Sequence, residues 1–79
     1  MEIAQCLSEY ISKHILGEST TLIQYNERII SSGIVDSFHL VDLASFIEEV
    51  FGVNIDISEL NAQTFDSINE LTDLIKKKL

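Results

Sequence analysis

The chain has 79 residues, enough for one small domain with a single hydrophobic core and too few for a second domain that would enclose a catalytic cleft. Thirteen acidic against five basic residues give a formal charge of −8, which disfavours nucleic acid and anionic membranes as partners and favours basic protein surfaces. A single cysteine cannot form an internal disulfide, and no apolar run approaches the length of a membrane span or a secretory signal, so we expect a cytoplasmic protein.

The composition favours an all-α fold. Hydrophobic residues make up 46% of the chain and aromatic residues only 8%, so the expected core is mostly Ile, Leu and Val. Proline is absent and there are only three glycines, which favours helices over a turn-rich sheet. We expect a small helical bundle of three main helices, one short helix and a long first loop, within one domain spanning residues 1–79.

Residues 2–16 form the first predicted helix, which is amphipathic. Its apolar side carries Ile3, Leu7, Tyr10, Ile11 and Ile15, and its polar side carries Glu2, Gln5, Ser8, Glu9, Ser12 and Lys13. Gly17 is placed to end this helix. We interpret Cys6 as a small, partly buried hydrophobe rather than a redox or metal residue. His14 has no Cys or His at ligand spacing, and we interpret it as a residue that favours the helix dipole.

The periodicity is lost over residues 18–36. Residues 19–21 and 26–28 are typical of a loop, but several neighbours are too apolar for a loop that lies free in water: Leu22, Ile23, Tyr25, Ile29, Ile30 and Ile34. A connection of this length in so small a domain is unusual and commonly functional. We therefore expect it to wrap the bundle and hold these side chains in the core. A helical turn over residues 22–26 is compatible with the pattern, and residues 31–33 predict a turn.

The second helix is predicted over residues 37–51, ended by Gly52. Its core stripe is Leu40, Leu43, Ala44, Ile47 and Phe51, flanked by Val41 and Val50, with Asp42, Glu48 and Glu49 solvated. Residues 53–57 alternate in polarity, but the sequence offers no partner strand, so a connecting loop is favoured.

Two further helices complete the pattern. A short helix is expected over residues 58–62, capped by Asp56 or Ser58. The last helix begins near residues 66–67, where Ser67 and Glu70 have the spacing of a capping box. Its buried face is Ile68, Leu71, Leu74 and Ile75. The lysines at 76–78 favour the negative end of the helix dipole, so we interpret this charge run as structural.

Enzymatic chemistry finds little support in the residue pattern. Glu48 and Glu49 are adjacent on a helix, diverge by about 100° and do not converge on one substrate. Ser37 with His39 or His14 is a poor nucleophile and base, because residues two apart on a helix do not face each other and no strand-to-helix elbow is present. No calcium loop, zinc spacing or glycine-rich phosphate cradle occurs, so no metal site is expected.

Three runs of residues carry a family resemblance: G-I-V-D-S-F at 33–38, L-V-D-L at 40–43 and I-E-E-V-F-G-V at 47–53. In their helical frame they resemble the modification site of the phosphopantetheine-dependent acyl and peptidyl carrier proteins, and the likeness extends over nearly the whole chain. The resemblance implies an acyl-carrier-protein-like fold. It also implies that a phosphopantetheinyl transferase attaches 4′-phosphopantetheine from coenzyme A to the Ser37 hydroxyl, with Mg²⁺ required only by that transferase. Asp36 belongs to the motif and caps the second helix.

The same resemblance implies a non-catalytic protein whose arm carries a thioester. Its partners would be the transferase and the enzymes that load, condense or modify the cargo, and we expect a monomer. The partner-docking residues would be Phe38, His39, Val41, Asp42, Glu48 and Glu49. A phosphodiester on Ser37 suits the positive end of a helix, and the acidic side chains would steer the carrier towards basic patches.

Three functions remain open at this point. The main hypothesis is a discrete acyl carrier for fatty-acid-like or polyketide-like synthesis. Phe38 and His39 differ from the Leu and acidic residue usual after the serine in primary fatty-acid carriers, and they resemble discrete carriers of specialised pathways. The alternative is accordingly a peptidyl or aminoacyl carrier, including D-alanyl carriers. The remaining alternative is an unmodified helical interaction module in which Ser37 is only a helix cap.

Overall fold

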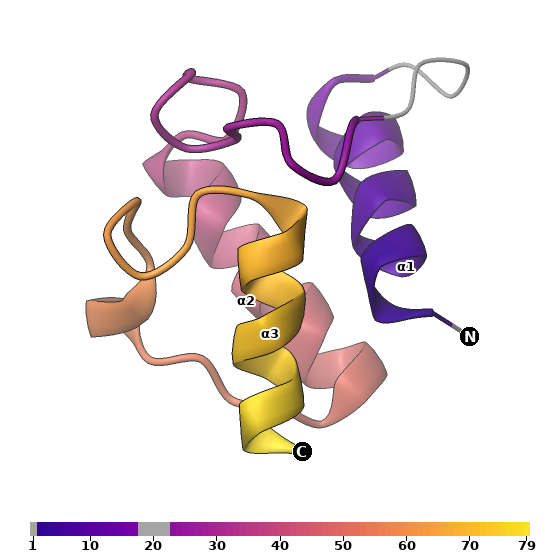
Figure 1. Ribbon diagram of the computed structural model, residues 1–79, viewed down its shortest axis with the longest axis vertical. Coiled ribbons are helices and arrows are strands. Elements are labelled where there is room, and N and C mark those ends of the chain that lie inside the picture. Colours follow the sequence, from indigo (N-terminus) through magenta and orange to yellow (C-terminus); the bar gives the residue numbers. More distant parts are fainter. Residues whose placement is uncertain (1, 18–22) are drawn as a thin grey trace.

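The computed structural model describes residues 2–17 and 23–79, which form a small helical bundle (Figure 1). Its helices are α1 (Ile3–Tyr10), the π-helical η1 (Ile11–Ile15), α2 (Ser37–Phe51), the 3₁₀ helix η2 (Ile57–Glu59) and α3 (Ile68–Lys78). Over these residues no strand forms, which confirms the predicted all-α class. Three main helical segments and one short helix occur, as the sequence pattern predicts.

The predicted apolar stripes meet in one core. The residues buried from the three main helical segments are Leu7, Ile11, Leu40, Leu43, Ile47, Ile68, Leu71 and Ile75. The other predicted stripe residues are half-buried at its margin: Ile3, Tyr10, Ile15, Ala44, Phe51 and Leu74. Because each helix buries one stripe, its opposite side faces solvent and is free to contact partners.

The first helical segment departs from the prediction on its polar side. Ser8 and Ser12 were expected to face solvent, and both are buried. They flank the apolar stripe on the side that the first connection covers, and the Ser8 hydroxyl donates to the Ile23 carbonyl at 3.2 Å. This bond accounts for the burial of the Ser8 hydroxyl, whereas the buried Ser12 hydroxyl has no hydrogen-bond partner among the described residues. The helical segment ends at Ile15, and Gly17, which was predicted to stop it, follows two residues later with a positive φ of 74°.

The described part of the first connection is held against the core. Ile23, Ile29 and Val35 are buried, and Ile30 and Ile34 are half-buried, as expected. Tyr25 is the exception, because 38% of its surface remains exposed. Leu22 and the polar stretch 19–21 lie outside the described residues. No helix forms over residues 23–26, but a single turn does, in which the Glu27 amide donates to the Gln24 carbonyl at 3.1 Å.

The predicted turn before the second helix is present. The Gly33 amide donates to the Ile30 carbonyl at 3.0 Å. Gly33 has a φ of 88°, a conformation that side chains with a Cβ rarely adopt. The turn reverses the chain shortly before α2 and thereby sets where this helix starts.

The segment after α2 follows the loop prediction and corrects the extent of the short helix. Val53 and Ile55 are buried without forming a strand. The short helix η2 begins at Ile57 and ends at Glu59, not at 58–62 as expected. Asn61 ends it early, because its side chain accepts from the Thr64 amide at 2.9 Å and closes a turn instead.

Both later helices are capped by side chains at their starts. Asp56 caps η2 in a complete capping box with Glu59. Ser67 caps α3 as predicted and accepts from the Glu70 amide at 3.1 Å. The reciprocal bond differs from the prediction, since the Glu70 carboxylate accepts from the Asp66 amide at 2.7 Å.

At the other end of α3, Lys78 forms an ion pair with Glu59 of η2 at 3.1 Å. The cation lies at the end of the helix where the dipole favours it, which agrees with the structural interpretation of this lysine. Within residues 2–17 and 23–79, every helix is too short or too polar to cross a membrane.

Candidate functional site

Ser37 is the first residue of α2, and its side chain is exposed. The residue before it, Asp36, has an extended backbone and caps the helix by accepting from the His39 amide at 2.9 Å. The cap is therefore Asp36, as expected, and the hypothesis that Ser37 is itself the cap is wrong. The Ser37 hydroxyl lies at an open helix start without being needed to close it.

The exposed side of α2 is continuous with Ser37. At about 100° per residue, one arc of roughly 140° contains Ser37 and six further exposed residues. We call this arc the outer face, and its members are Ser37, Phe38, Val41, Asp42, Ser45, Glu48 and Glu49. It extends roughly 18 Å along the helix at 1.5 Å per residue. Five of the six predicted docking residues thus share one surface.

An apolar patch lies beside the serine on the outer face. Phe38 is 83% exposed and Val41 is 56% exposed. At such exposure, these two apolar side chains lie mostly outside the hydrophobic core. An exposed apolar patch with a polar rim is the usual composition of a protein interaction site.

His39 lies apart from the other predicted docking residues. It points roughly 160° away from Ser37 around the helix and is half-buried. Its Nδ1 lies 3.1 Å from Oδ1 of Asp36, within ion-pair distance but not aligned as a hydrogen bond. Its contact is with the helix cap, so the geometry supports a role in holding Asp36 more than a role in docking.

Ser45 is a member of the outer face that the sequence reasoning missed. It is exposed, one helical turn beyond Val41 and two turns beyond Ser37. The signal was available, because the same 3.6-residue period that predicts the buried stripe also predicts the opposite side. Its hydroxyl gives the chain a second exposed serine on the same helix.

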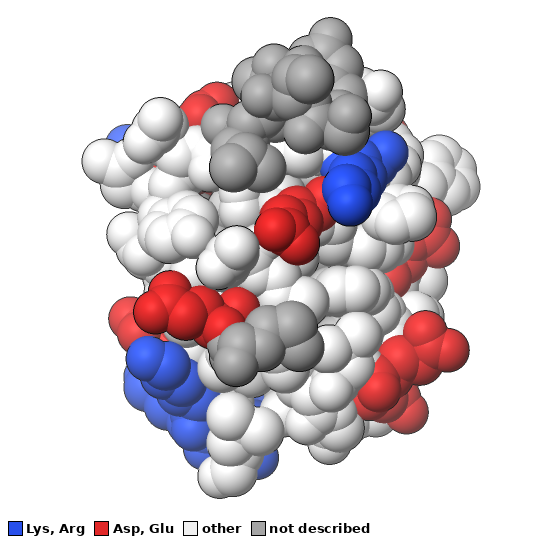
Figure 2. All heavy atoms as spheres, turned by 90° about the vertical axis from the view of Figure 1, so that its right-hand side faces the viewer, with Lys and Arg blue, Asp and Glu red and all other residues white. Residues whose placement is uncertain are grey.

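The far half of the outer face is acidic. The two ion pairs among residues 2–17 and 23–79 involve none of Asp42, Glu48 and Glu49. Burial, followed by the charges of Asp42 and Glu49, raises the pKa of the phenol of Tyr10 in α1. Figure 2 shows acidic groups spread over the face of the molecule that it displays, with basic groups gathered mainly in two places.

A nucleophile and base pair is not assembled around Ser37. His39 points away from it, as described above. His14 stacks on Tyr10 with ring centroids 4.8 Å apart, and Tyr10 stacks on Phe46 at 4.1 Å. Phe46 is nine residues along α2 from Ser37, roughly 13 Å at 1.5 Å per residue. Among the described residues, neither histidine is therefore placed beside Ser37 as a base.

The other candidates for a chemical role are the single cysteine and the potential metal ligands. Burial, followed by the charge of Glu9, raises the pKa of the half-buried Cys6 thiol, which disfavours the reactive thiolate. Among residues 2–17 and 23–79 no group of three His, Cys, Asp or Glu side chains is placed to hold a metal ion.

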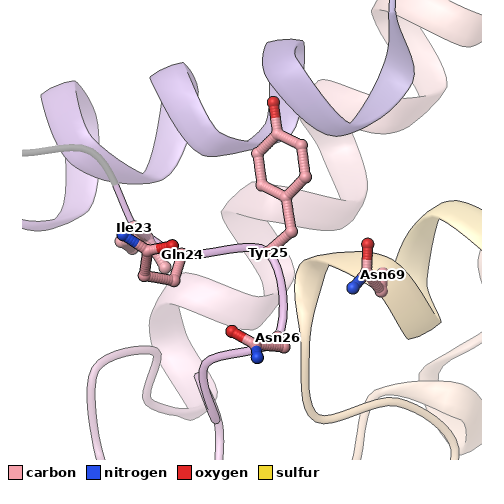
Figure 3. Close-up of a pocket in the computed structure, with 5 residues that line it drawn as sticks. All are labelled: Ile23, Gln24, Tyr25, Asn26 and Asn69. Atoms are coloured by element: carbon pink, nitrogen blue, oxygen red, sulfur yellow. The ribbon is translucent and has the colours of Figure 1, made fainter.

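A hollow of about 470 Å³ lies between the first connection and the start of α3 (Figure 3). The residues that line it are Ile23, Gln24, Tyr25, Asn26 and Asn69, none of which is a predicted site residue. Comparison with known protein families and with curated proteins found no match for this chain. A functional assignment therefore rests on the motif around Ser37 and on the geometry of α2.

Proposed function

We propose that this chain is a carrier protein whose Ser37 hydroxyl receives 4′-phosphopantetheine as a phosphodiester. The observation that carries the proposal is the exposure of Ser37 at the first position of α2, directly after the Asp36 cap and within the carrier-like run at residues 33–38. A transferase can reach this hydroxyl without local unfolding. When bound, the arm supplies a terminal thiol that holds cargo as a thioester.

The start of α2 suits the phosphate of such an arm. Leu40 makes the first backbone bond of the helix, to the Asp36 carbonyl at 2.9 Å, and the His39 amide donates to the Asp36 side chain. The amides of Ser37 and Phe38 come before these two donors in the chain, and they have no acceptor within the helix. Unpaired amides at the positive end of a helix favour an anion, so these two groups would hold the phosphodiester.

The outer face supports docking to several enzymes in turn. Phe38 and Val41 offer an apolar contact beside the attachment point, and three carboxylates follow within the next two turns. Such carboxylates accelerate encounter with basic partners more than they strengthen the final complex. The partners that fit are a phosphopantetheinyl transferase and loading, condensing or modifying enzymes with basic residues around an apolar patch.

The test is the intact mass after incubation with coenzyme A, Mg²⁺ and a broad-specificity phosphopantetheinyl transferase. Wild type and Ser45→Ala should each gain one phosphopantetheine, and Ser37→Ala should gain none. Ser45→Ala is a matched control, because it removes an exposed hydroxyl from the same face of the same helix. An unmodified wild type beside a modified control carrier would refute the proposal.

The cargo is proposed to be an acyl group, with an aminoacyl group as the alternative. The acidity of the chain favours a stand-alone acyl carrier, whereas Phe38 and His39 resemble carriers of specialised pathways. Loading the modified protein with acyl donors and, separately, with amino acids and an adenylating enzyme distinguishes the two. The thioester that accumulates identifies the cargo class.

A second candidate is an unmodified helical interaction module. The strong exposure of Phe38 and Val41 favours it, because an apolar patch alone suffices for protein contact. This function predicts that the transferase adds no phosphopantetheine to wild type or to Ser37→Ala, and that Ser37→Ala leaves the contacts with partner proteins unchanged.

A further inference from the structure

The chain approaches the Ser37 site through a closed loop, which we call the approach loop and define as residues 29–35. Its two end residues, Ile29 and Val35, are buried in the core. The Val35 amide donates to the Ile29 carbonyl at 2.8 Å and closes the loop. Since Asp36 follows Val35 directly, the end of the approach loop determines where the α2 cap and Ser37 are placed.

One carboxylate from the other end of the chain holds this loop. Oδ1 of Asp66 accepts from the Ile30 amide at 2.8 Å and from the Ser31 amide at 2.9 Å, and its Oδ2 accepts from the Ser31 hydroxyl at 2.5 Å. The Asp66 carbonyl also accepts from the Ile29 amide at 2.9 Å. Four hydrogen bonds therefore join the approach loop to the residue that precedes the cap of α3.

Asp66 is itself held in place. Its amide donates to Glu70 at 2.7 Å, and the next residue, Ser67, caps α3. A second link between the two regions runs from the Asn69 amide to the Tyr25 carbonyl at 3.0 Å, beside the hollow of Figure 3. A rigid helix start thus fixes the carboxylate, and the carboxylate fixes the loop.

Hydrogen bonds from the approach loop, and to a smaller extent the charge of Arg28, favour the ionised form of Asp66. The hollow that contains it is also lined by Arg28 from the connection and Glu70 from α3. The donors of Ser31 and Ile30, with the charge of Arg28, lower the pKa of Asp66. At neutral pH the side chain is an acceptor for all three loop donors.

We propose that Asp66 is a positioning residue for the modification of Ser37, acting through the approach loop. The proposal rests on the proposed carrier function. With Asp66 in place, a transferase meets a loop and helix start that are already ordered. Without it, the loop must be ordered on binding, which weakens the encounter complex but leaves the reaction at the hydroxyl unchanged. Loss of Asp66 should therefore raise KM and leave kcat nearly unchanged.

Three variants test the proposal in the full chain. Asp66→Ala removes both carboxylate oxygens and with them three hydrogen bonds, whereas Asp66→Asn keeps an oxygen for the Ile30 and Ser31 amides. Asp73→Ala is the control, since it removes an exposed carboxylate from α3, the helix that follows Asp66. Circular dichroism establishes that each variant is folded. If Asp66→Ala is not, the expected result is a small rise in KM for Asp66→Asn with kcat unchanged.

The first readout is hydrogen exchange. Exchange at the Ile30 and Ser31 amides should accelerate in Asp66→Ala and much less in Asp66→Asn. The second readout is the rate of phosphopantetheine transfer from coenzyme A. For Asp66→Ala we expect KM to rise about threefold to tenfold, with kcat within about twofold, the range that ordering one or two groups on binding produces. The rise in KM should be much smaller for Asp66→Asn, and the KM and kcat of Asp73→Ala should match those of wild type.

The outcomes separate the two proposals. If wild type is not modified while a control carrier is, the carrier function fails and the role of Asp66 in it fails as well. If wild type is modified but the folded Asp66 variants keep its KM, or lose kcat instead, the carrier function stands and the positioning role is overturned.

Discussion

Oδ1 of Asp36 accepts the His39 amide at 2.9 Å and lies 3.1 Å from Nδ1 of the same residue. The backbone amide of His39 thus holds one carboxylate oxygen at the start of α2, and its imidazole lies beside that oxygen without a hydrogen bond. Because this hydrogen bond caps the N-terminus of α2, the neighbouring Ser37 is not needed as the cap. Stability and modification at this helix start should therefore be separable by mutation.

Substitution at the cap provides the first prediction. Asp36→Ala should lower the free energy of unfolding by about 1 kcal/mol, because the His39 amide loses its acceptor. Ser37→Ala should change that free energy by less than about 0.5 kcal/mol, as is usual for an exposed position. Urea denaturation followed by circular dichroism measures both. A larger loss for Ser37→Ala than for Asp36→Ala would contradict the assignment of the cap.

The helices were predictable from local pattern because their determinants are local. The 3.6-residue spacing of Leu40, Leu43 and Ile47 predicts the buried side of α2, and Gly52 ends that helix with a positive φ of 70°. The same spacing indicates the outer face, although Ser45 was overlooked. Local signals therefore predicted most of the candidate site.

Contacts between distant segments were not predictable in this way. Ser8 appeared polar and exposed because its acceptor, the Ile23 carbonyl, is supplied by a chain segment 15 residues away. Asp66 appeared to be only part of a helix start, yet it holds Ser31, 35 residues earlier in the chain. Side-chain pairing over such separations follows from the tertiary fold, and one sequence does not reveal it.

The apolar patch on the outer face provides the second prediction. Phe38→Ala and Val41→Ala should each raise KM for the transferase several-fold, since they remove apolar contact area at a docking surface. Both side chains are strongly exposed, so each substitution should change the free energy of unfolding by less than about 0.5 kcal/mol. Val50→Ala is a matched control on another side of α2, and steady-state kinetics of coenzyme A consumption measure all three. Equal effects at Val50 would refute a specific patch.

The acidic half of the outer face provides the third prediction. Replacing Asp42, Glu48 and Glu49 by Asn, Gln and Gln should slow association with a basic partner enzyme and flatten its salt dependence. The screening length is about 8 Å at physiological ionic strength, so the wild-type rate should fall as salt is added. Stopped-flow association at several ionic strengths measures this effect. Asp73→Asn, on α3, should leave the salt dependence nearly unchanged, and a wild-type rate insensitive to salt would contradict electrostatic steering.

The approach loop provides the fourth prediction, on pH. Hydrogen bonds from Ser31 lower the pKa of Asp66, and those from the Asp56 amide and Lys78 lower the pKa of Glu59. A carboxyl group whose pKa is lowered in the folded state stabilises the fold above its unfolded pKa, about 3.9 for Asp and 4.3 for Glu. That stability is lost as the pH falls through the lowered folded value.

Urea denaturation of wild type, Asp66→Asn and Glu59→Gln between about pH 6 and pH 3 measures this effect. Wild type should exceed each variant in stability at pH 6, and the difference should shrink as the pH falls below the ordinary carboxyl values. Asp73→Asn, which breaks none of these hydrogen bonds, is the control variant. A difference that stays constant down to pH 3 would mean that the ionised form of Asp66 does not hold the approach loop.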